Sequence, residues 1–451
     1  MKKTTIFLLI LFLVVLTGHG QKPRLLITTD IGGDPDDQQS LIRLMLYSCD
    51  FEIEGLITSA SGTPGELDKS IIRPDLVEKT IRTYEEVWQN LAMHREGYPS
   101  PDYLLSVVKR GNPNRGWEYV GEGHDTEASE WIISCADKKD ARPLNISIWG
   151  GQTDVAQALW KVKNTRTPRQ YNDFVSRFRI HDIADQDGIF HRMQESFPGV
   201  FYVLNSAPEG EDKRNAAFRG MYLGGEENLT SLQWIKEHVA EDHGPLGALY
   251  PLKTWTAPNP HGVMKEGDTP SWFYFLENRL NCPEHPEYGG WGGRFHQTEK
   301  GFYTCASDNF LEETNSRATV YRWRGDFQRE FAARMDWCIK ARNESNHAPG
   351  VVVNRHSKMK PLYIKAKPGK KIKLNASGTS DPDGDALQYQ WLVYNEAGNY
   401  SGNFVLKETG NNVEFHMPEL NENSSLHVIL KVTDTGTPGL TGYKRIVLKR
   451  R

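Results

Sequence analysis

The stretch RLLITTDIGGDPDDQQSLIRLML, residues 24–46, contains a short apolar run, a glycine turn and an amphipathic segment. This order predicts a buried strand followed by a helix. Four aspartates, Asp30, Asp34, Asp36 and Asp37, crowd the turn between them. Close like charges repel one another unless a cation lies among them. The aspartates are therefore either turn and helix-capping residues, or ligands for a hard cation such as Ca²⁺.

The alternation of apolar runs and amphipathic segments continues to about residue 340. FEIEGLITSAS (51–61) precedes VEKTIRTYEEVWQNL (77–91), and LNISIWGG (144–151) precedes DVAQALWKV (154–162). Alternating strands and helices predict an α/β domain whose mostly parallel sheet carries helices on both faces. In such sheets ligands bind at the carboxyl ends of the strands. The sequences TTDIGGDPDD and WGGQTD both fall at such ends.

The N-terminal residues have the pattern of a targeting segment. Lys2 and Lys3 precede the apolar run IFLLILFLVVL (6–16), and small residues follow it. This pattern predicts a signal peptide over residues 1–20. The run is too short to span a bilayer easily. We therefore expect an exported protein, periplasmic or extracellular, without stable membrane insertion.

After about residue 345 the pattern of apolar and polar residues differs from that of the α/β region. KIKLNASGTSDPDGDALQYQWLVY (371–394) alternates apolar and polar residues between turn residues. It predicts an all-β sandwich and resembles PKD/Ig-like modules. We expect an α/β domain over residues 21–345 and an Ig-like β-sandwich over residues 350–451. Its aspartates Asp381, Asp383 and Asp385 are either a calcium site or plain turn residues.

Composition excludes some classes of partner. The chain of 451 residues has 54 basic and 58 acidic side chains, a net charge of −4, so no basic field indicates nucleic acid. The five cysteines have no zinc-ligand spacing and cannot all pair. Cys282 and Cys305 are one possible loop disulfide. The sequence does not determine the oligomeric state.

The segment RLLITTDIGGDPDDQQSL resembles the N-terminal fingerprint of the calcium-dependent nucleoside hydrolases. That resemblance implies that Asp30 ligates calcium and serves as the catalytic base, and that Asp37 is a second calcium ligand. Asp36 is then the contact to sugar hydroxyls. Two departures are visible: Thr28 replaces an aspartate of the family, and the loop is two residues longer. The longer loop carries Asp34, which could take the sugar role instead.

Further segments match the same family in order. ISIWGGQTDVAQAL implies that the backbone carbonyl of Thr153 binds calcium, and GDTPSWFYFL implies Asp268 as the last calcium ligand. GLITSASGTPGE places Thr63 near the site. FRIHDIADQDGIF resembles the segment that reaches over the sugar, with His181 or Asp182 facing it.

The sequence departs from the family at the position of the general acid. The family commonly has a histidine immediately before the last aspartate, but Gly267 stands there. His261 is near in sequence and is the first candidate for protonating the leaving group, with His124 as another option. Each histidine could equally be structural.

The segment 244–315 is rich in glycine, proline and tryptophan, a composition typical of long ordered loops that wall a pocket. Tryptophan faces stack on sugar rings, and arginine binds hydroxyls or carboxylates. Trp291 and Arg294 are therefore predicted to bind substrate, and Trp255 and Trp272 are further candidates from the same segment. The alternative for all four is packing of the loops against one another.

The complete mature chain resembles an exported bacterial group in which a nucleoside-hydrolase-like domain precedes an Ig-like domain, a group described as cellulose-binding. The resemblance implies a carbohydrate or nucleoside-like partner. We expect a calcium-dependent glycoside hydrolase that cleaves a furanose-like or glycan-derived sugar with a metal-bound water. The alternatives are a non-catalytic carbohydrate-binding protein and a true exported nucleoside hydrolase.

Overall fold

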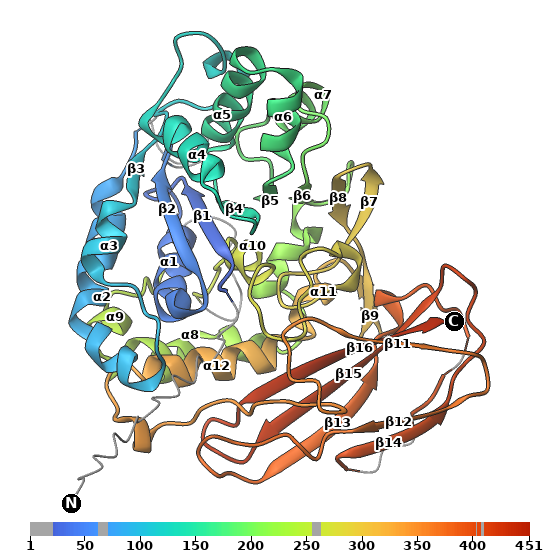
Figure 1. Cartoon of the computed structure of the whole chain (residues 1–451). Coiled ribbons are helices and arrows are strands. Elements are labelled where there is room, and N and C mark those ends of the chain that lie inside the picture. The colour runs from blue at the N-terminus through green and yellow to red at the C-terminus, as the bar shows by residue number, and fades with distance from the viewer. Residues whose placement is uncertain (1–20, 62–70, 255–262, 403, 407–409) are drawn as a thin grey trace, which may run out of the picture.

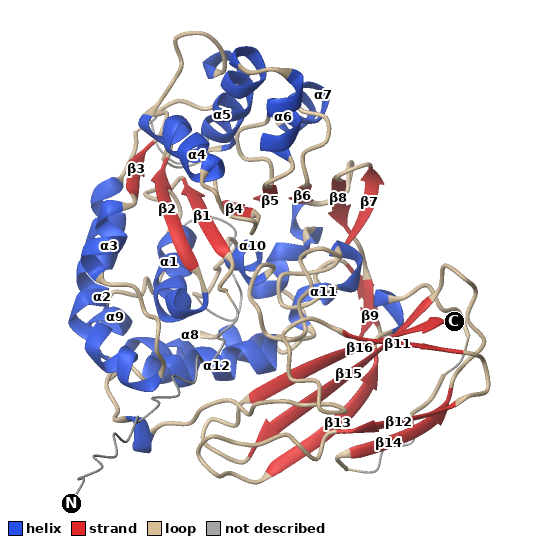
Figure 2. Cartoon of the chain, viewed as in Figure 1, coloured by secondary structure: helices blue, strands red, loops and turns tan. Residues whose placement is uncertain are grey.

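The computed structural model describes residues 21–61, 71–254, 263–402, 404–406 and 410–451. An N-terminal α/β domain is followed by a C-terminal domain built almost entirely from strands (Figures 1 and 2). The predicted fold class is confirmed. The predicted signal peptide lies outside the described residues.

One large sheet organises the first domain. Its strand order is β3-β2-β1-β4-β5-β6-β8-β7, and every pair is parallel except β7 with β8. The strand order reverses direction at β1, which pairs with β2 on one side and β4 on the other. The strands are β1 (Arg24–Thr29), β2 (Glu52–Thr58), β3 (Val108–Arg110), β4 (Leu144–Ile148), β5 (Phe178–Ile183), β6 (Tyr202–Asn205), β7 (Phe295–Glu299) and β8 (Phe302–Cys305).

Helices cover both faces of this sheet (Figure 2). Alternate residues of β1 point to opposite faces, so Leu25 and Ile27 join one apolar core and Leu26 joins the other. The first core includes residues of α1, α2, α10 and α12, and the second those of α4, α5, α6 and α7. The helices are α1 (Asp36–Tyr47), α2 (Pro74–His94), α3 (Pro101–Ser106), α4 (Glu127–Asp137), α5 (Gln152–Thr165), α6 (Pro168–Val175), α7 (Phe190–Ser196), α8 (Leu232–Ile235), α9 (Gly244–Ala248), α10 (Thr269–Phe273), α11 (Ala318–Tyr321) and α12 (Arg324–Asp336).

The C-terminal domain has its own apolar core between two sheets. The larger sheet has the order β11-β16-β15-β13, and β12 pairs with β14 in the smaller one. The sandwich is not wholly antiparallel, because β11 runs parallel to β16. The strands of this domain are β11 (Leu362–Ala366), β12 (Lys371–Asn375), β13 (Leu387–Val393), β14 (Asn412–His416), β15 (Ser425–Asp434) and β16 (Thr441–Arg450), and a small hairpin before it consists of β9 (Asp308–Phe310) and β10 (Glu313–Asn315).

The glycine- and tryptophan-rich segment packs between the two domains. The Trp291 indole N–H donates to the Tyr443 hydroxyl (3.2 Å), and the buried Arg445 guanidinium donates to the Leu280 and Gly289 carbonyls, each at 2.8 Å. These contacts bury polar groups with their partners satisfied. The segment therefore contributes to a fixed domain junction.

All five cysteines are free, so the possible Cys282–Cys305 disulfide is not formed. None of the helices in the described ranges is both long and apolar enough to cross a lipid bilayer.

Candidate metal and sugar site

The candidate site lies where the strand order of the large sheet reverses. Asp30 directly follows β1, and the Gly150–Gly151 turn directly follows the neighbouring β4. The carboxyl ends of two adjacent parallel strands diverge at such a point and leave room for a ligand. Residues from both ends therefore meet at one edge of the sheet.

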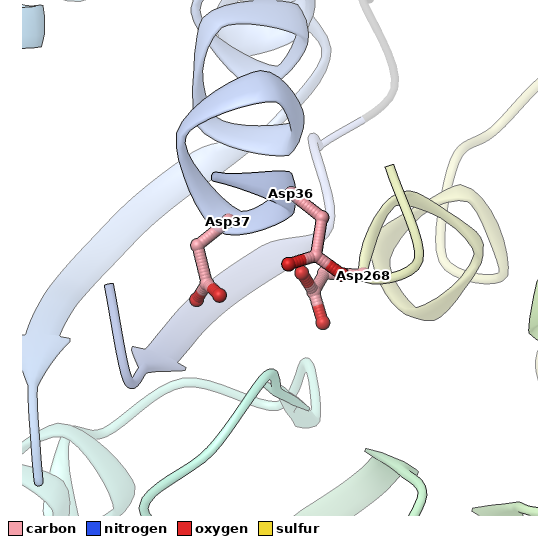
Figure 3. A group of neighbouring side chains, drawn as sticks. All are labelled: Asp36, Asp37 and Asp268. Atoms are coloured by element: carbon pink, nitrogen blue, oxygen red, sulfur yellow. The ribbon is translucent and has the colours of Figure 1, made fainter. Parts of the chain in front are cut away.

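Three carboxyl groups converge at this edge. Asp36 and Asp37 project from the first turn of α1, and Asp268 projects from the segment that precedes α10 (Figure 3). One oxygen of each lies within 4.8 Å of the others, a spacing at which one metal ion can bind all three. Asp37 and Asp268 are buried, and Asp36 is partly buried.

The electrostatics of this cluster suit a divalent cation. Burial raises the pKa values of Asp36, Asp37 and Asp268, and the neighbouring carboxylates raise those of Asp37 and Asp268 further. The Oδ2 atom of Asp268 is buried and has no hydrogen-bond partner within the described part of the chain. Calcium prefers several carboxylate and carbonyl oxygens, so the residues present fit the ion implied by the sequence resemblance.

Asp30 lies beside the cluster and is 4% exposed. Burial raises the pKa of its carboxyl to about 7; Arg115 opposes this shift, while Asp36 and Asp187 add to it. The nearest Arg115 nitrogen is 3.5 Å from Asp30 Oδ2. A β-carbon on Gly150, where φ is +158°, would lie 2.7 Å from the Asp30 side chain, so glycine allows the close approach of this turn.

Lys265 is a cation that sequence reasoning did not include in the site. Its ammonium group forms an ion pair with Asp34 and lies 3.6 Å from Asp36 Oδ2. Asp34 and Asp36 raise the pKa of Lys265 against the effect of its burial, so the lysine is charged. A lysine three residues before the predicted ligand Asp268 is the only local sequence signal for this contact.

A second set of buried contacts fixes the segment that carries Asp268. Gln39 of α1 accepts the backbone N–H of Lys265 (2.9 Å) and donates to the carbonyls of Pro251 (2.8 Å) and Val263 (2.9 Å). Glu266, which is fully buried, accepts a bond from the Tyr250 hydroxyl (2.6 Å). These bonds tie the segment to α1, which presents Asp36 and Asp37.

Thr153 is the second residue of α5, the helix that follows the Gly150–Gly151 turn. Its backbone N–H and its hydroxyl both donate to Asp187 Oδ2, at 2.8 and 2.6 Å. Asp187, which lies in the FRIHDIADQDGIF segment, was not singled out from the sequence. The structure thus brings this segment to Thr153 through Asp187 rather than through either of its two predicted residues.

Those two predicted residues, His181 and Asp182, lie in the interior without exposed surface. The His181 ring packs against Tyr274 and Phe295, and burial lowers its pKa to about 3. Asp182 Oδ2 accepts bonds from Gln152 and from the Tyr202 hydroxyl, at 2.8 and 2.7 Å. We therefore assign both residues a positioning role and leave them out of the proposed sugar contacts.

Trp291 and Arg294 also take positions that differ from the expected ones. Trp291 is 1% exposed and packs edge-on against Phe273 and Tyr443, so its ring faces are not open to a sugar at the acidic site. Arg294 donates to Asp308 (2.7 Å), which also accepts a bond from the Tyr394 hydroxyl of the β-domain (2.6 Å). Both side chains pack and form hydrogen bonds at the domain junction, which agrees with loop packing, the alternative to substrate binding.

Of the remaining predicted residues, Trp272 and His124 lie in the described part of the chain. Trp272 is fully buried against Tyr47 and Phe273. His124 packs edge-on against Tyr119. Three further predicted residues lie outside the described part of the chain: Thr63, Trp255 and His261.

The position expected to hold a histidine is sterically tight. A β-carbon on Gly267 would lie 3.3 Å from Asp36 Oδ2 and from two ring atoms of Phe218. A larger side chain would need its neighbours to move. Glycine therefore fits this packing, and no proton donor extends from this position.

Comparison with known proteins agrees with this geometry. Residues 24–295 match the nucleoside hydrolase-like domain of cellulose-binding Sde182, and residues 371–450 match the C-terminal domain of cellulose-binding protein Sde0182. The chain belongs to this family. The expected resemblance, which rested on the aspartate-rich turn and the two-domain order, is confirmed.

A solved structure is similar over nearly the full length of the chain. It is a nucleoside hydrolase-related hypothetical protein from Saccharophagus degradans that is associated with carbohydrate metabolism. The two sequences are 32% identical, the match covers 95% of this chain and 100% of the other, and the TM-score is 0.79. Two protocadherin structures match about a fifth of the chain with TM-scores of 0.13 and 0.15, which are too low to support an argument. No curated protein matches the sequence.

Proposed function

We propose that this protein is an exported, calcium-dependent glycoside hydrolase that acts on a furanose-like or glycan-derived sugar. The observation that carries the proposal is the position of Asp30. This buried carboxyl, with a pKa raised to about 7, lies beside three carboxylates close enough to share one cation. A carboxyl with a pKa near the working pH is suited to general acid–base catalysis.

In this proposal Asp30, Asp37 and Asp268 hold the calcium ion together with the backbone carbonyl of Thr153. Asp36, the third member of the carboxylate cluster, is close enough to add a ligand or to bind a sugar hydroxyl beside the ion. When bound, the ion supplies positive charge that orients hydroxyl groups and lowers the pKa of water. The buried ion pair of Arg43 with Glu266 keeps the Asp268 segment in place against α1. The free energy needed to bring these carboxylates together is therefore supplied during folding rather than during binding.

Asp30 is the proposed catalytic base that takes the proton from an attacking water. Arg115, 3.5 Å away, limits how far burial raises the Asp30 pKa and so favours the carboxylate form. The buried carboxylates around the site also stabilise positive charge that develops on the sugar ring in an oxocarbenium-like transition state.

The polar groups around Asp36 favour a sugar as the bound group. Asp34, Asp36 and Lys265 form a set of charged acceptors and donors at the site. Such a set can bind vicinal hydroxyls. The tight packing at Gly267 leaves no acid at the position where nucleoside hydrolases protonate a base. We therefore favour a glycan-derived leaving group over a nucleobase. His261 remains the proposed proton donor to that group, and Thr63 remains a proposed substrate contact.

The family and the solved relative support carbohydrate as the class of ligand. One is described as cellulose-binding, and the other as associated with carbohydrate metabolism. The N-terminal pattern of two lysines and an apolar run supports export. An exported protein encounters glycans more readily than cytosolic nucleosides.

The second candidate is a carbohydrate-binding protein without catalytic activity. Gly267 favours it, because the usual proton donor of the nucleoside hydrolases is missing at this position. Asp30 argues for hydrolysis, although it could remain as a metal ligand alone. A true exported nucleoside hydrolase is the third candidate, and it requires cleavage of inosine or uridine.

One preparation of the mature protein can separate these candidates. Bound calcium is measured first, and the protein is then incubated with nucleosides, aryl furanosides and plant or microbial glycans, with and without chelator. Chelator-sensitive release of a sugar from a glycoside supports the hydrolase. Glycan binding without release supports the binding protein, and release of ribose from nucleosides alone supports the third candidate. A preparation that binds no calcium contradicts the proposed site.

A further inference from the structure

A cavity of about 360 Å³ lies at the junction of the two domains and shares no lining residue with the acidic cluster. The α/β domain contributes the end of α2, the segment 276–279 and one side of α12. The linker 347–350 and residues 440–443 at the start of β16 complete the wall. Its volume lies within the range of small-molecule sites, about 300–1,000 Å³.

Four arginines and three acidic residues line this junction cavity. Two of the arginines are neutralised within the protein. Arg95 and Arg334 both bind the buried Asp50, at 2.7 and 2.9 Å, and Arg334 also binds Glu330 at 2.7 Å. These groups form a closed ion-pair network that needs no ligand.

The other two arginines, Arg279 and Arg342, have no carboxylate within 4.0 Å among the described residues. Arg279 donates to the Ser357 carbonyl (3.3 Å), and Arg342 donates to the His94 carbonyl and contacts His347. A guanidinium group has five N–H donors, so these bonds leave most of its donors available.

Two further observations concern the segment 278–279 of the cavity wall. The Nδ2 atom of Asn278 is buried and has no hydrogen-bond partner among the residues that the structure describes, although Asn278 Oδ1 accepts from two backbone N–H groups. Arg279 has a left-handed backbone (φ +64°), and its carbonyl accepts the N–H of Arg445 in β16. A non-glycine residue in this region is strained, and strain of this kind gathers at binding sites.

We propose that the junction cavity binds a carboxylate-bearing sugar, such as a uronic acid residue of a glycan. Arg279 and Arg342 bind the carboxylate, because the planar guanidinium group matches its geometry. Asn278 donates to a ring or hydroxyl oxygen, and Glu277, which lines the same cavity, accepts from hydroxyls. Leu276 and Met359 provide apolar contact for the ring. The site does not depend on calcium or on the proposed hydrolase activity.

Isothermal titration of the full mature chain tests this proposal with four probes: digalacturonate, glucuronate, neutral cellobiose and the non-sugar carboxylate citrate. The variants are Arg279→Asn, which suits a left-handed backbone, and Arg342→Gln, whose side chain is exposed. Arg214→Gln is the matched control, because Arg214 is an exposed arginine outside the cavity that pairs with Asp212.

We expect saturable binding of a uronate, weakened about tenfold or more by either cavity variant, since hydrogen bonds to charged groups contribute about 1.5–3 kcal/mol. Arg214→Gln retains full affinity, and so does Asp268→Ala, which removes a ligand of the proposed calcium site. Retention in Asp268→Ala separates this site from the hydrolase proposal.

Several results would overturn the assignment. One is the absence of saturable binding by any carboxylate. A second is unchanged affinity in both cavity variants. Equal binding of cellobiose would exclude a role for the carboxylate, and equal binding of citrate would exclude the sugar.

Discussion

Arg43 of α1 and Glu266, which lies two residues before Asp268, form an ion pair with no exposed side-chain surface and a nitrogen–oxygen distance of 2.5 Å. Arg43 also donates to Gln328 of α12 at 2.7 Å and lies over the Phe331 ring. Glu266 has a left-handed backbone (φ +41°) and accepts a bond from the Thr269 hydroxyl at 3.1 Å. The pair therefore links the helix that carries two candidate ligands to the segment that carries the third.

Breaking this pair from one side should destabilise the protein strongly. Glu266→Gln and Arg43→Met each leave a buried group without its charged partner, a change that costs about 3–5 kcal/mol. Denaturant unfolding followed by fluorescence measures the loss. Arg82→Ala, which breaks an exposed ion pair with Glu85, should change the free energy of unfolding by less than about 1 kcal/mol. Equal effects of Arg82→Ala and Glu266→Gln would contradict the role of the buried pair.

Substitutions at the acidic site should separate metal binding from catalysis. Asp37→Ala and Asp268→Ala remove carboxylate ligands and should reduce calcium affinity at least tenfold, which titration calorimetry can measure. Asp30→Asn retains a ligand oxygen but removes the base. We expect it to keep bound calcium, with lower affinity, and to lose about 10²–10⁴-fold in the rate of any glycoside cleavage. Undiminished cleavage by Asp30→Asn would exclude Asp30 as the base.

Calcium affinity should rise with pH across the neutral range. Without a cation, the Asp30 carboxyl has a pKa of about 7, and the pKa values of Asp37 and Asp268 are also raised. Calcium binds the carboxylate form, so binding releases protons and weakens as pH falls through 7. Titrations at pH 5.5, 7 and 8.5 test this order. A pH-independent affinity would indicate that Asp30 is ionised before calcium binds.

Asp154 should make the free energy of unfolding depend on pH. Burial raises its pKa to about 6, against the hydrogen bonds that it accepts from Thr126 and the Asn112 N–H. Since the folded-state pKa lies above the unfolded value, this contribution to stability is present below about pH 4 and is lost as pH rises through 6. Asp154→Asn, whose amide oxygen can accept the same bonds, should stabilise the calcium-free protein at pH 7.5 by up to about 3 kcal/mol. The two proteins should have similar stability at pH 3.8, and a constant difference at both pH values would contradict this origin.

Trp291 should matter for the domain junction and not for sugar binding at the acidic site. Trp291→Ala removes a buried indole that contacts Phe273, Phe327 and Tyr443, a change that costs about 3–5 kcal/mol. Calorimetry should show a lower unfolding temperature. The affinity for glycans at the acidic site should remain within about twofold of the original below that temperature, because Trp291 lies outside the cluster. A selective loss of glycan affinity at the acidic site would show that Trp291 contributes to sugar binding there.

The sequence alone determined the strand, turn and helix around Asp30, Asp36 and Asp37. Period-two and helical patterns act over a few residues, and local sterics and burial decide them. The same reasoning supports the α/β domain followed by a β-sandwich. Resemblance to a known family added Asp268, which no local pattern links to the first turn.

Only the tertiary structure decided which polar groups meet at that turn. Lys265, Arg115 and Asp187 reach the site because strand order and helix packing bring distant segments together. The same packing places Trp291 in the domain junction and His181 in the interior. Residue type predicts what a side chain can bind, but burial and neighbours determine what it does bind, and both depend on contacts between segments far apart in the chain.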